Sequence, residues 1–133
     1  MSSLQNMIIK FIQSQERNIQ LDFYLRSQII MQIYKLSDVK NWGFDIENQI
    51  TNDMIIELTF KKQKFDNVNN KRRLLDSDLF EKFYKFERIK EDSYWTGLDC
   101  AQKIELIENR ILKIIYTVYD LNGETIQYTL NAY

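Results

Sequence analysis

The sequence predicts an α+β fold within one domain that spans residues 1–133. Two observations carry this expectation. Apolar residues recur at helical spacing in several stretches, and Asn122-Gly123 follows a run of β-branched and aromatic residues, which is the strongest short signal of a β-hairpin. We therefore expect N-terminal helices and a small antiparallel sheet ending in a C-terminal β-hairpin at about 113–132, with the helices packed on one face. A helical bundle carrying the hairpin as an appendage is the rival architecture.

The first part of the chain, residues 4–36, contains neither glycine nor proline and predicts two helices. The apolar stripe of the first helix comprises Leu4, Met7, Ile8, Phe11 and Ile12. A polar stretch at 14–18 separates this helix from the second. Apolar and polar residues also alternate over 18–25, so that segment stays open between helix and strand.

The middle of the chain predicts a connection, a strand and a loop. Residues 37–53 form the connection, in which Trp42 and Phe44 are expected to cover the edge of the core. Residues 54–65 alternate apolar and polar side chains, as in a strand with one buried face. The polar, asparagine-rich residues 66–73 predict a mobile loop.

Two more helices are expected before the hairpin. The first begins near Ser77, where Asp78 and Glu81 fit a capping box. After a link at 91–97, the second is predicted over 99–112 from an apolar stripe of Cys100, Ile104, Ile107 and Ile111. In the hairpin that follows, one face carries the side chains of Ile115, Tyr119, Ile126 and Leu130. We assign that face to the core because it is the more apolar one.

Composition and charge exclude several classes of function. The chain has no histidine and one cysteine, which excludes histidine-based catalysis, a zinc site and an internal disulfide within it. A net charge of −1 offers no overall field that would draw nucleic acid or an anionic membrane. No secretory signal pattern or long apolar run occurs, so we expect a cytoplasmic protein without membrane contact.

The most conspicuous charged feature is a basic cluster between 61 and 73. It comprises Lys61, Lys62, Lys64, Lys71, Arg72 and Arg73. If the fold brings them together, these cations are suited to contact phosphates while neighbouring aromatic rings stack on bases. The alternative interpretation is a solvated strand end whose lysines discourage edge pairing.

The second candidate surface is acidic and aromatic. Residues 76–133 hold eleven acidic and seven basic side chains, which suits an anionic face that docks a basic protein. Within this half, Glu91, Asp92, Tyr94 and Trp95 are the candidate partner-binding residues, because Tyr and Trp are enriched among interface anchors. The competing interpretation places Tyr94 and Trp95 in the core and leaves the two acids solvated.

We therefore expect a non-catalytic protein, without metal or cofactor, that binds and blocks another protein. Inhibitors, immunity proteins and antitoxins are of this kind, and a basic toxin or nuclease-like target is the partner that the acidic half suits. A nucleic-acid-binding module that uses 61–73 is the alternative. An enzyme built on carboxylates, or a ligand pocket lined by aromatic side chains, is the third hypothesis.

Overall fold

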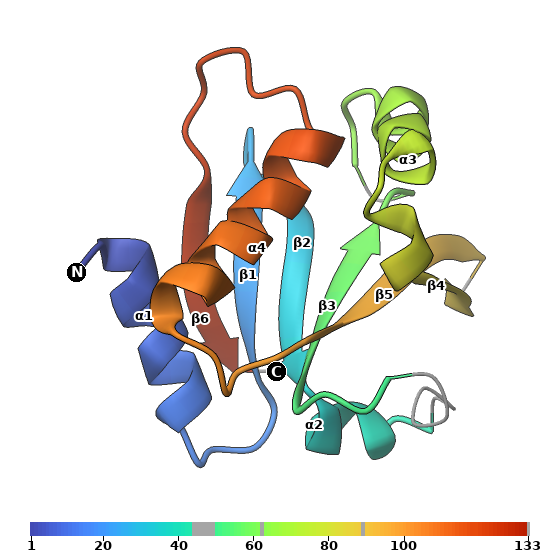
Figure 1. Cartoon of the computed structure of the whole chain (residues 1–133). Helices are drawn as coiled ribbons and strands as arrows, with labels where there is room; N and C mark the ends of the chain where they lie inside the picture. The colour runs from blue at the N-terminus through green and yellow to red at the C-terminus, as the bar shows by residue number, and fades with distance from the viewer. Residues whose placement is uncertain (44–49, 62, 89, 133) are drawn as a thin grey trace.

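The computed structural model describes residues 1–43, 50–61, 63–88 and 90–132, and it confirms the α+β class (Figure 1). The described helices are α1 (Ser3–Gln13), α2 (Leu36–Lys40), α3 (Asn67–Asp76), the 3₁₀ helix η1 (Phe80–Lys82) and α4 (Ile104–Val118). The strands are β1 (Ile19–Leu25), β2 (Gln28–Lys35), β3 (Met54–Thr59), β4 (Tyr84–Arg88), β5 (Glu91–Leu98) and β6 (Gln127–Ala132). They form one antiparallel sheet in the order β4-β5-β3-β2-β1-β6, so the rival helical bundle is wrong.

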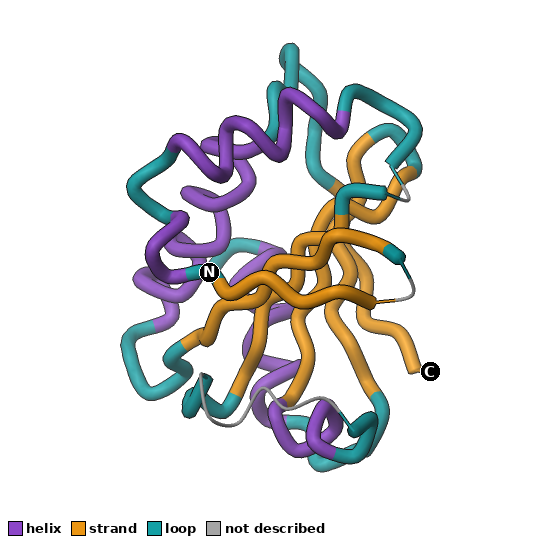
Figure 2. The backbone as a smooth tube through the Cα atoms, turned by 90° about the vertical axis from the view of Figure 1, so that its right-hand side faces the viewer, coloured by secondary structure: helices purple, strands orange, loops and turns teal. Residues whose placement is uncertain are grey.

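Helices α1, α3 and α4 lie on one side of the sheet, and α4 runs across β1 and β2 (Figures 1 and 2). The main core fills this layer. From α4 it receives Ile107, Ile111, Ile114, Ile115 and Val118, which are all buried. A smaller cluster lies at one end of the opposite sheet face, where Val39 of α2 packs with Tyr34, Ile55 and Trp95.

The predicted C-terminal hairpin is wrong, because residues 114–118 belong to α4 and β6 pairs with β1. The turn itself was predicted correctly. Asn122 and Gly123 have φ angles of 48° and 77°, and the Glu124 N–H donates to the Leu121 carbonyl oxygen at 2.7 Å. This turn leads from the end of a helix into a strand. Ile115 and Tyr119 are nevertheless buried, and Ile126 and Leu130 pack partly buried against the core.

The N-terminal prediction is half confirmed. Helix α1 matches the first predicted helix, and the Ser2 side chain caps it by accepting from the Gln5 N–H at 3.1 Å. The second helix is wrong, since β1 and β2 occupy its place and the strand alternative at 18–25 is the correct one. Arg26 and Ser27 both have positive φ and form the tight turn between these strands.

Between β3 and α4 the predicted pattern of loop, helix and link is also wrong. The segment 66–73 is largely helical in α3, whose start Asp66 caps by accepting from the Asn69 N–H at 3.1 Å. The helix expected from Ser77 is reduced to η1 and followed by β4, and the link at 91–97 is β5. The predicted strand at 54–65 is confirmed over 54–59, and α4 begins at Ile104 rather than near Asp99. Phe44 lies outside the described residues.

Candidate functional site

One face of the sheet carries an unusually dense set of polar side chains. On β1, Leu21 and Phe23 enter the main core, so the alternate residues project from the opposite face. No helix in the described part of the chain covers the middle of that face, which we call the open face. Its members are Gln20, Asp22, Tyr24, Gln32, Tyr34, Glu57, Thr59, Arg88, Glu91, Ser93, Thr129 and Asn131.

Asp22 lies near the middle of β1 and is only 2% exposed. Its carboxylate accepts hydrogen bonds from Gln20 Nε2 at 2.9 and 3.1 Å, from Gln32 Nε2 at 2.9 Å and from Asn131 Nδ2 at 2.5 Å. The Tyr24 hydroxyl is a further donor at 3.5 Å. All these donors are neutral, and no described cation forms an ion pair with Asp22. The carboxylate is therefore held in place by hydrogen bonds that leave its charge unbalanced.

Glu57 on β3 is the second buried acid of the open face, with 1% exposure. Arg88 Nη1 lies 3.3 and 3.5 Å from its two carboxylate oxygens. Burial raises the pKa of Glu57, while the positive charge of Arg88 opposes that rise. Burial also raises the pKa of Tyr34, and the neighbouring Glu57 charge adds to the effect. Tyr34 therefore stays protonated across the physiological range.

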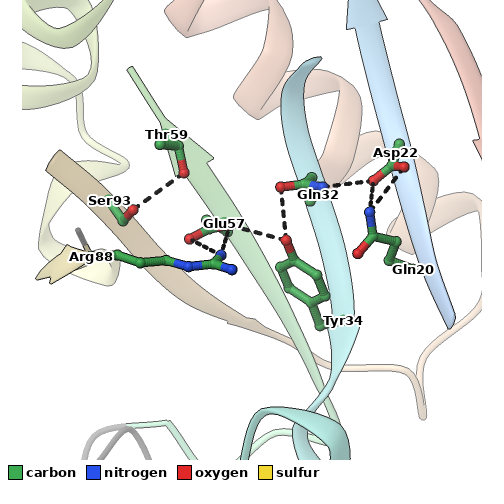
Figure 3. Close-up of polar contacts among 8 residues, drawn as sticks. All are labelled: Gln20, Asp22, Gln32, Tyr34, Glu57, Thr59, Arg88 and Ser93. Carbon is green, nitrogen blue, oxygen red and sulfur yellow. Dashed lines mark hydrogen bonds and ion pairs between the residues drawn. The ribbon is translucent and has the colours of Figure 1, made fainter. Parts of the chain in front are cut away.

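The Tyr34 hydroxyl connects the hydrogen bonds around Asp22 with those around Glu57. It donates to Gln32 Oε1 at 2.7 Å and lies 3.1 Å from Glu57 Oε1. Because Gln32 Nε2 donates to Asp22, the chain of contacts runs from β1 across β2 and β3 to Arg88 on β4 (Figure 3). A separate hydroxyl pair, Thr59 and Ser93 at 3.2 Å, links β3 to β5. Side chains locked in this way give the face a fixed shape.

A small pocket of about 100 Å³ opens beside Glu57. Gln32, Thr59, Arg88 and Glu91 line it together with Ile29, which is exposed. The pocket is therefore bordered by two carboxylates, those of Glu57 and Glu91, and by one guanidinium, that of Arg88. The pocket is too small for a drug-sized molecule and suits a single side chain or a small polar group.

The structure separates the four residues predicted to bind a partner. Tyr94 and Trp95 lie on β5 with 2% and 0% exposure, which confirms the core interpretation and leaves neither as a surface anchor. Glu91 and Asp92 alternate along β5 and face opposite sides of the sheet. Glu91 lines the open-face pocket, whereas Asp92 pairs with Lys71 and, at 3.4 Å, with Lys85. The hydrogen bond from Lys71 holds the pKa of Asp92 below its usual value.

The predicted basic cluster is also divided. Lys61 donates to the Lys90 carbonyl oxygen at 2.9 Å, and Lys71 pairs with Asp92. Arg73 lies 3.9 Å from Asp120. Lys64 and Arg72 are exposed, and Lys62 lies outside the described residues.

Sequence reasoning missed Asp22, Gln32, Tyr34 and Glu57 as a group. Gln20, Asp22 and Tyr24 alternate with apolar residues, which is the signal that would have marked β1 as a strand with a polar face. The sequence left this segment open between helix and strand, and the polar face of the strand alternative was not followed to a site. Glu57 was assigned to the solvated face of its strand, and only the sheet order shows that it is buried next to Arg88.

Comparison of this chain with protein-family models, curated proteins and solved structures gave no significant match. The fold is an α+β domain built on a six-stranded antiparallel sheet, and the site has to be interpreted from its own chemistry. Among the residues that the structure describes, no three His, Cys, Asp or Glu side chains gather as a metal site requires. No described helix is both long and apolar enough to cross a bilayer.

Proposed function

We propose that this chain is a non-catalytic binding domain, of the inhibitor, immunity or antitoxin kind, that holds a basic partner protein on its open face. The observation that carries the proposal is the position of Asp22 and Glu57. Both carboxylates are buried and fixed by hydrogen bonds, yet they belong to a sheet face whose middle no described helix covers.

The fixed geometry favours recognition of another protein. Ordering a side chain at an interface costs about 0.5–1.5 kcal/mol, and this cost falls when the free protein already holds the bound rotamer. Gln20, Gln32 and Asn131 are tied to Asp22 before any partner arrives. The open face therefore presents amide groups that lose little freedom on binding.

The charge of the face supports a basic partner. The open face carries three carboxylates and one guanidinium, from Asp22, Glu57, Glu91 and Arg88 in that order. The hydrogen-bond donors around Asp22 are all neutral. A field of this sign accelerates the encounter with a positively charged protein and disfavours an acidic one.

The same contacts favour binding over catalysis. A general acid or base must reach the substrate proton directly or through one water. The oxygens of Asp22 are occupied by donors from β1, β2 and β6, and Glu57 is held by Tyr34 and Arg88. These contacts tie both acids into the sheet.

A cross-linking experiment tests the proposal. A photo-reactive amino acid replaces Thr129 on the open face. In the matched control it replaces Asn109, which is exposed on α4 on the helical side of the sheet. In the native cell, Thr129 should cross-link one basic protein and Asn109 should not. Equal cross-linking from both positions would contradict the use of this face.

The isolated pair then allows a measurement of affinity and blocking. Glu91→Lys should weaken binding about tenfold or more and relieve inhibition of the partner, because it reverses a charge within the face. Glu105→Lys makes the same charge change on the exposed side of α4 and should leave both unchanged. If the two variants behave alike, the acidic open face is not the interface.

The nucleic-acid alternative stays a prediction, and Lys64 and Arg72 are exposed cations of that cluster. Titration with RNA and DNA at two salt concentrations distinguishes it from the proposed function. Phosphate-driven affinity must fall steeply with salt and must weaken when both cations are replaced by glutamine.

A further inference from the structure

A second pocket lies at the other end of the sheet, away from the acids of the open face. It has a volume of about 300 Å³ and is built from five parts of the chain. Asn52 comes from the segment before β3, Lys82 from η1, Tyr84 from β4, Thr96 and Gly97 from β5, and Arg110 from α4. The size is at the lower end of small-molecule sites.

Arg110 is the unusual member of this pocket, because it is half-buried without a counter-ion. Its Nη2 donates to Thr96 Oγ1 at 3.2 Å, and no carboxylate of the described residues forms an ion pair with it. Burial lowers the pKa of Arg110, because removing the guanidinium from water disfavours its charged form. The comparable half-buried cations Lys71 and Arg88 are each paired with an acid. A guanidinium carries five N–H donors, and one neutral hydroxyl uses few of them.

The sheet edge adds to the site. Strand β4 stops pairing with β5 at Tyr84 and Trp95, whereas β5 continues to Leu98. On that side the residues from Thr96 to Leu98 therefore have no neighbouring strand in the described part of the chain. The pocket lies at this free edge, and a side chain at 97 would disturb it. A Cβ atom built there would lie 1.9 Å from Asn52 Oδ1, so glycine leaves room for the Asn52 amide.

From this arrangement we propose that the pocket binds a small ligand through a carboxylate or phosphate group, with Arg110 as its principal contact. A planar guanidinium binds either oxyanion with two parallel hydrogen bonds. Lys82 adds a second positive charge at the exposed rim, and Thr96 fixes the orientation of Arg110. Glu81 also lines the pocket, so the balance there is two cations against one acid. The ligand supplies the counter-ion that the half-buried Arg110 lacks.

Nuclear magnetic resonance of the full chain tests this site. The chain has three glycines, so the Gly97 amide signal is readily assigned, and the Arg110 Nε–H signal is followed beside it. Inorganic phosphate and succinate are the two probes, and sodium chloride at equal ionic strength controls for screening. Saturable shifts of both signals are expected with at least one probe and not with chloride. The probe that binds more tightly identifies whether phosphate or carboxylate is preferred.

Three variants make the result specific. Arg110→Gln should weaken the anion affinity about tenfold or more, since a hydrogen bond to a charged group is lost. Arg110→Lys keeps the positive charge but loses the planar guanidinium that forms two parallel hydrogen bonds, so it should bind with intermediate affinity. Arg72→Gln removes an exposed arginine of α3 and should bind as the wild type does.

Thermal unfolding gives an independent readout, because a ligand that binds the native state raises its stability. Anion should raise the melting temperature of the wild type and of Arg72→Gln, and the rise should be lost in Arg110→Gln. The proposal is overturned if neither probe gives a saturable shift in the wild type. It is equally overturned if Arg110→Gln, folded by its amide spectrum, responds as the wild type does.

Discussion

The hydroxyl group of Tyr119 donates a hydrogen bond to the backbone carbonyl oxygen of Ile30 at 2.7 Å. Ile30 is the extra residue of a β-bulge, since Phe23 pairs with Met31 while Tyr24 pairs with Ile29. The end of α4 thus satisfies a carbonyl group in the irregular part of β2. Gln63 Nε2 donates to the same hydroxyl at 2.8 Å, which ties the segment after β3 to this point.

Tyr119→Phe should therefore lower the free energy of unfolding by about 1–3 kcal/mol, because it leaves buried polar groups of Ile30 and Gln63 without a partner. Chemical denaturation measures the loss. The matched control is Tyr116→Phe, three residues earlier on the exposed side of α4, where the side chain is 60% exposed. It should change stability by less than about 0.5 kcal/mol. Equal effects of the two changes would contradict the role assigned to the Tyr119 hydroxyl.

Glu57 should make stability depend on pH. Burial raises its folded pKa above the ordinary value of 4.5, so the folded state holds the proton more tightly than the unfolded chain does. Its contribution to stability is therefore complete below about pH 4.5 and is lost as the pH rises through the folded pKa. The loss amounts to at most about 1.4 kcal/mol for each pH unit in that window.

Glu57→Gln removes this titration, so the stability of the variant relative to the wild type should increase as the pH rises from 4.5. Denaturant unfolding across a pH series measures the difference. Glu105→Gln serves as the control for loss of an exposed carboxylate. A wild-type advantage over Glu57→Gln that grows with pH would show that the ion pair with Arg88 outweighs burial.

The sequence predicted the α+β class and the turn at Asn122 and Gly123 because both depend on local pattern. It failed at residues 114–118, where β-branched residues suggested a strand. Ile114, Ile115 and Val118 continue the stripe of Ile107 and Ile111 at helical spacing, so burial against the sheet outweighs strand propensity.

The candidate site was less accessible to sequence reasoning. Asp22 and Asn131 are 109 positions apart and meet only because β6 pairs with β1. Sheet order is a tertiary property that no local pattern encodes. The interpretation of Tyr94 and Trp95 as core residues was confirmed, but the two side chains enter different clusters on opposite faces of β5, which only the sheet reveals.

Helix α4 offers a simple stabilising change. Its N-cap, Lys103, has extended backbone angles and makes no side-chain capping bond, while Glu105 lies in the first turn. Lys103→Ser should raise the free energy of unfolding by about 0.5–2 kcal/mol, because the hydroxyl accepts from a free N–H of the first turn. Lys103→Ala removes the lysine without supplying an acceptor and is the control. If both substitutions give the same change, the gain comes from charge and not from capping.

Cys100 provides a chemical test of the packing ahead of α4. Burial, with smaller contributions from the charges of Asp53 and Asp99, raises the pKa of the Cys100 thiol to about 11. Only the thiolate reacts with alkylating reagents, so at pH 8 the folded protein should react roughly a hundredfold more slowly than the unfolded chain. The rate in the folded protein should keep rising above pH 9, where an ordinary thiol levels off. Asp99→Asn should speed the reaction at pH 8, because it removes one of the charges that raise the pKa. A rate that levels off near pH 9 in the folded protein would mean that Cys100 is solvated and that this packing is wrong.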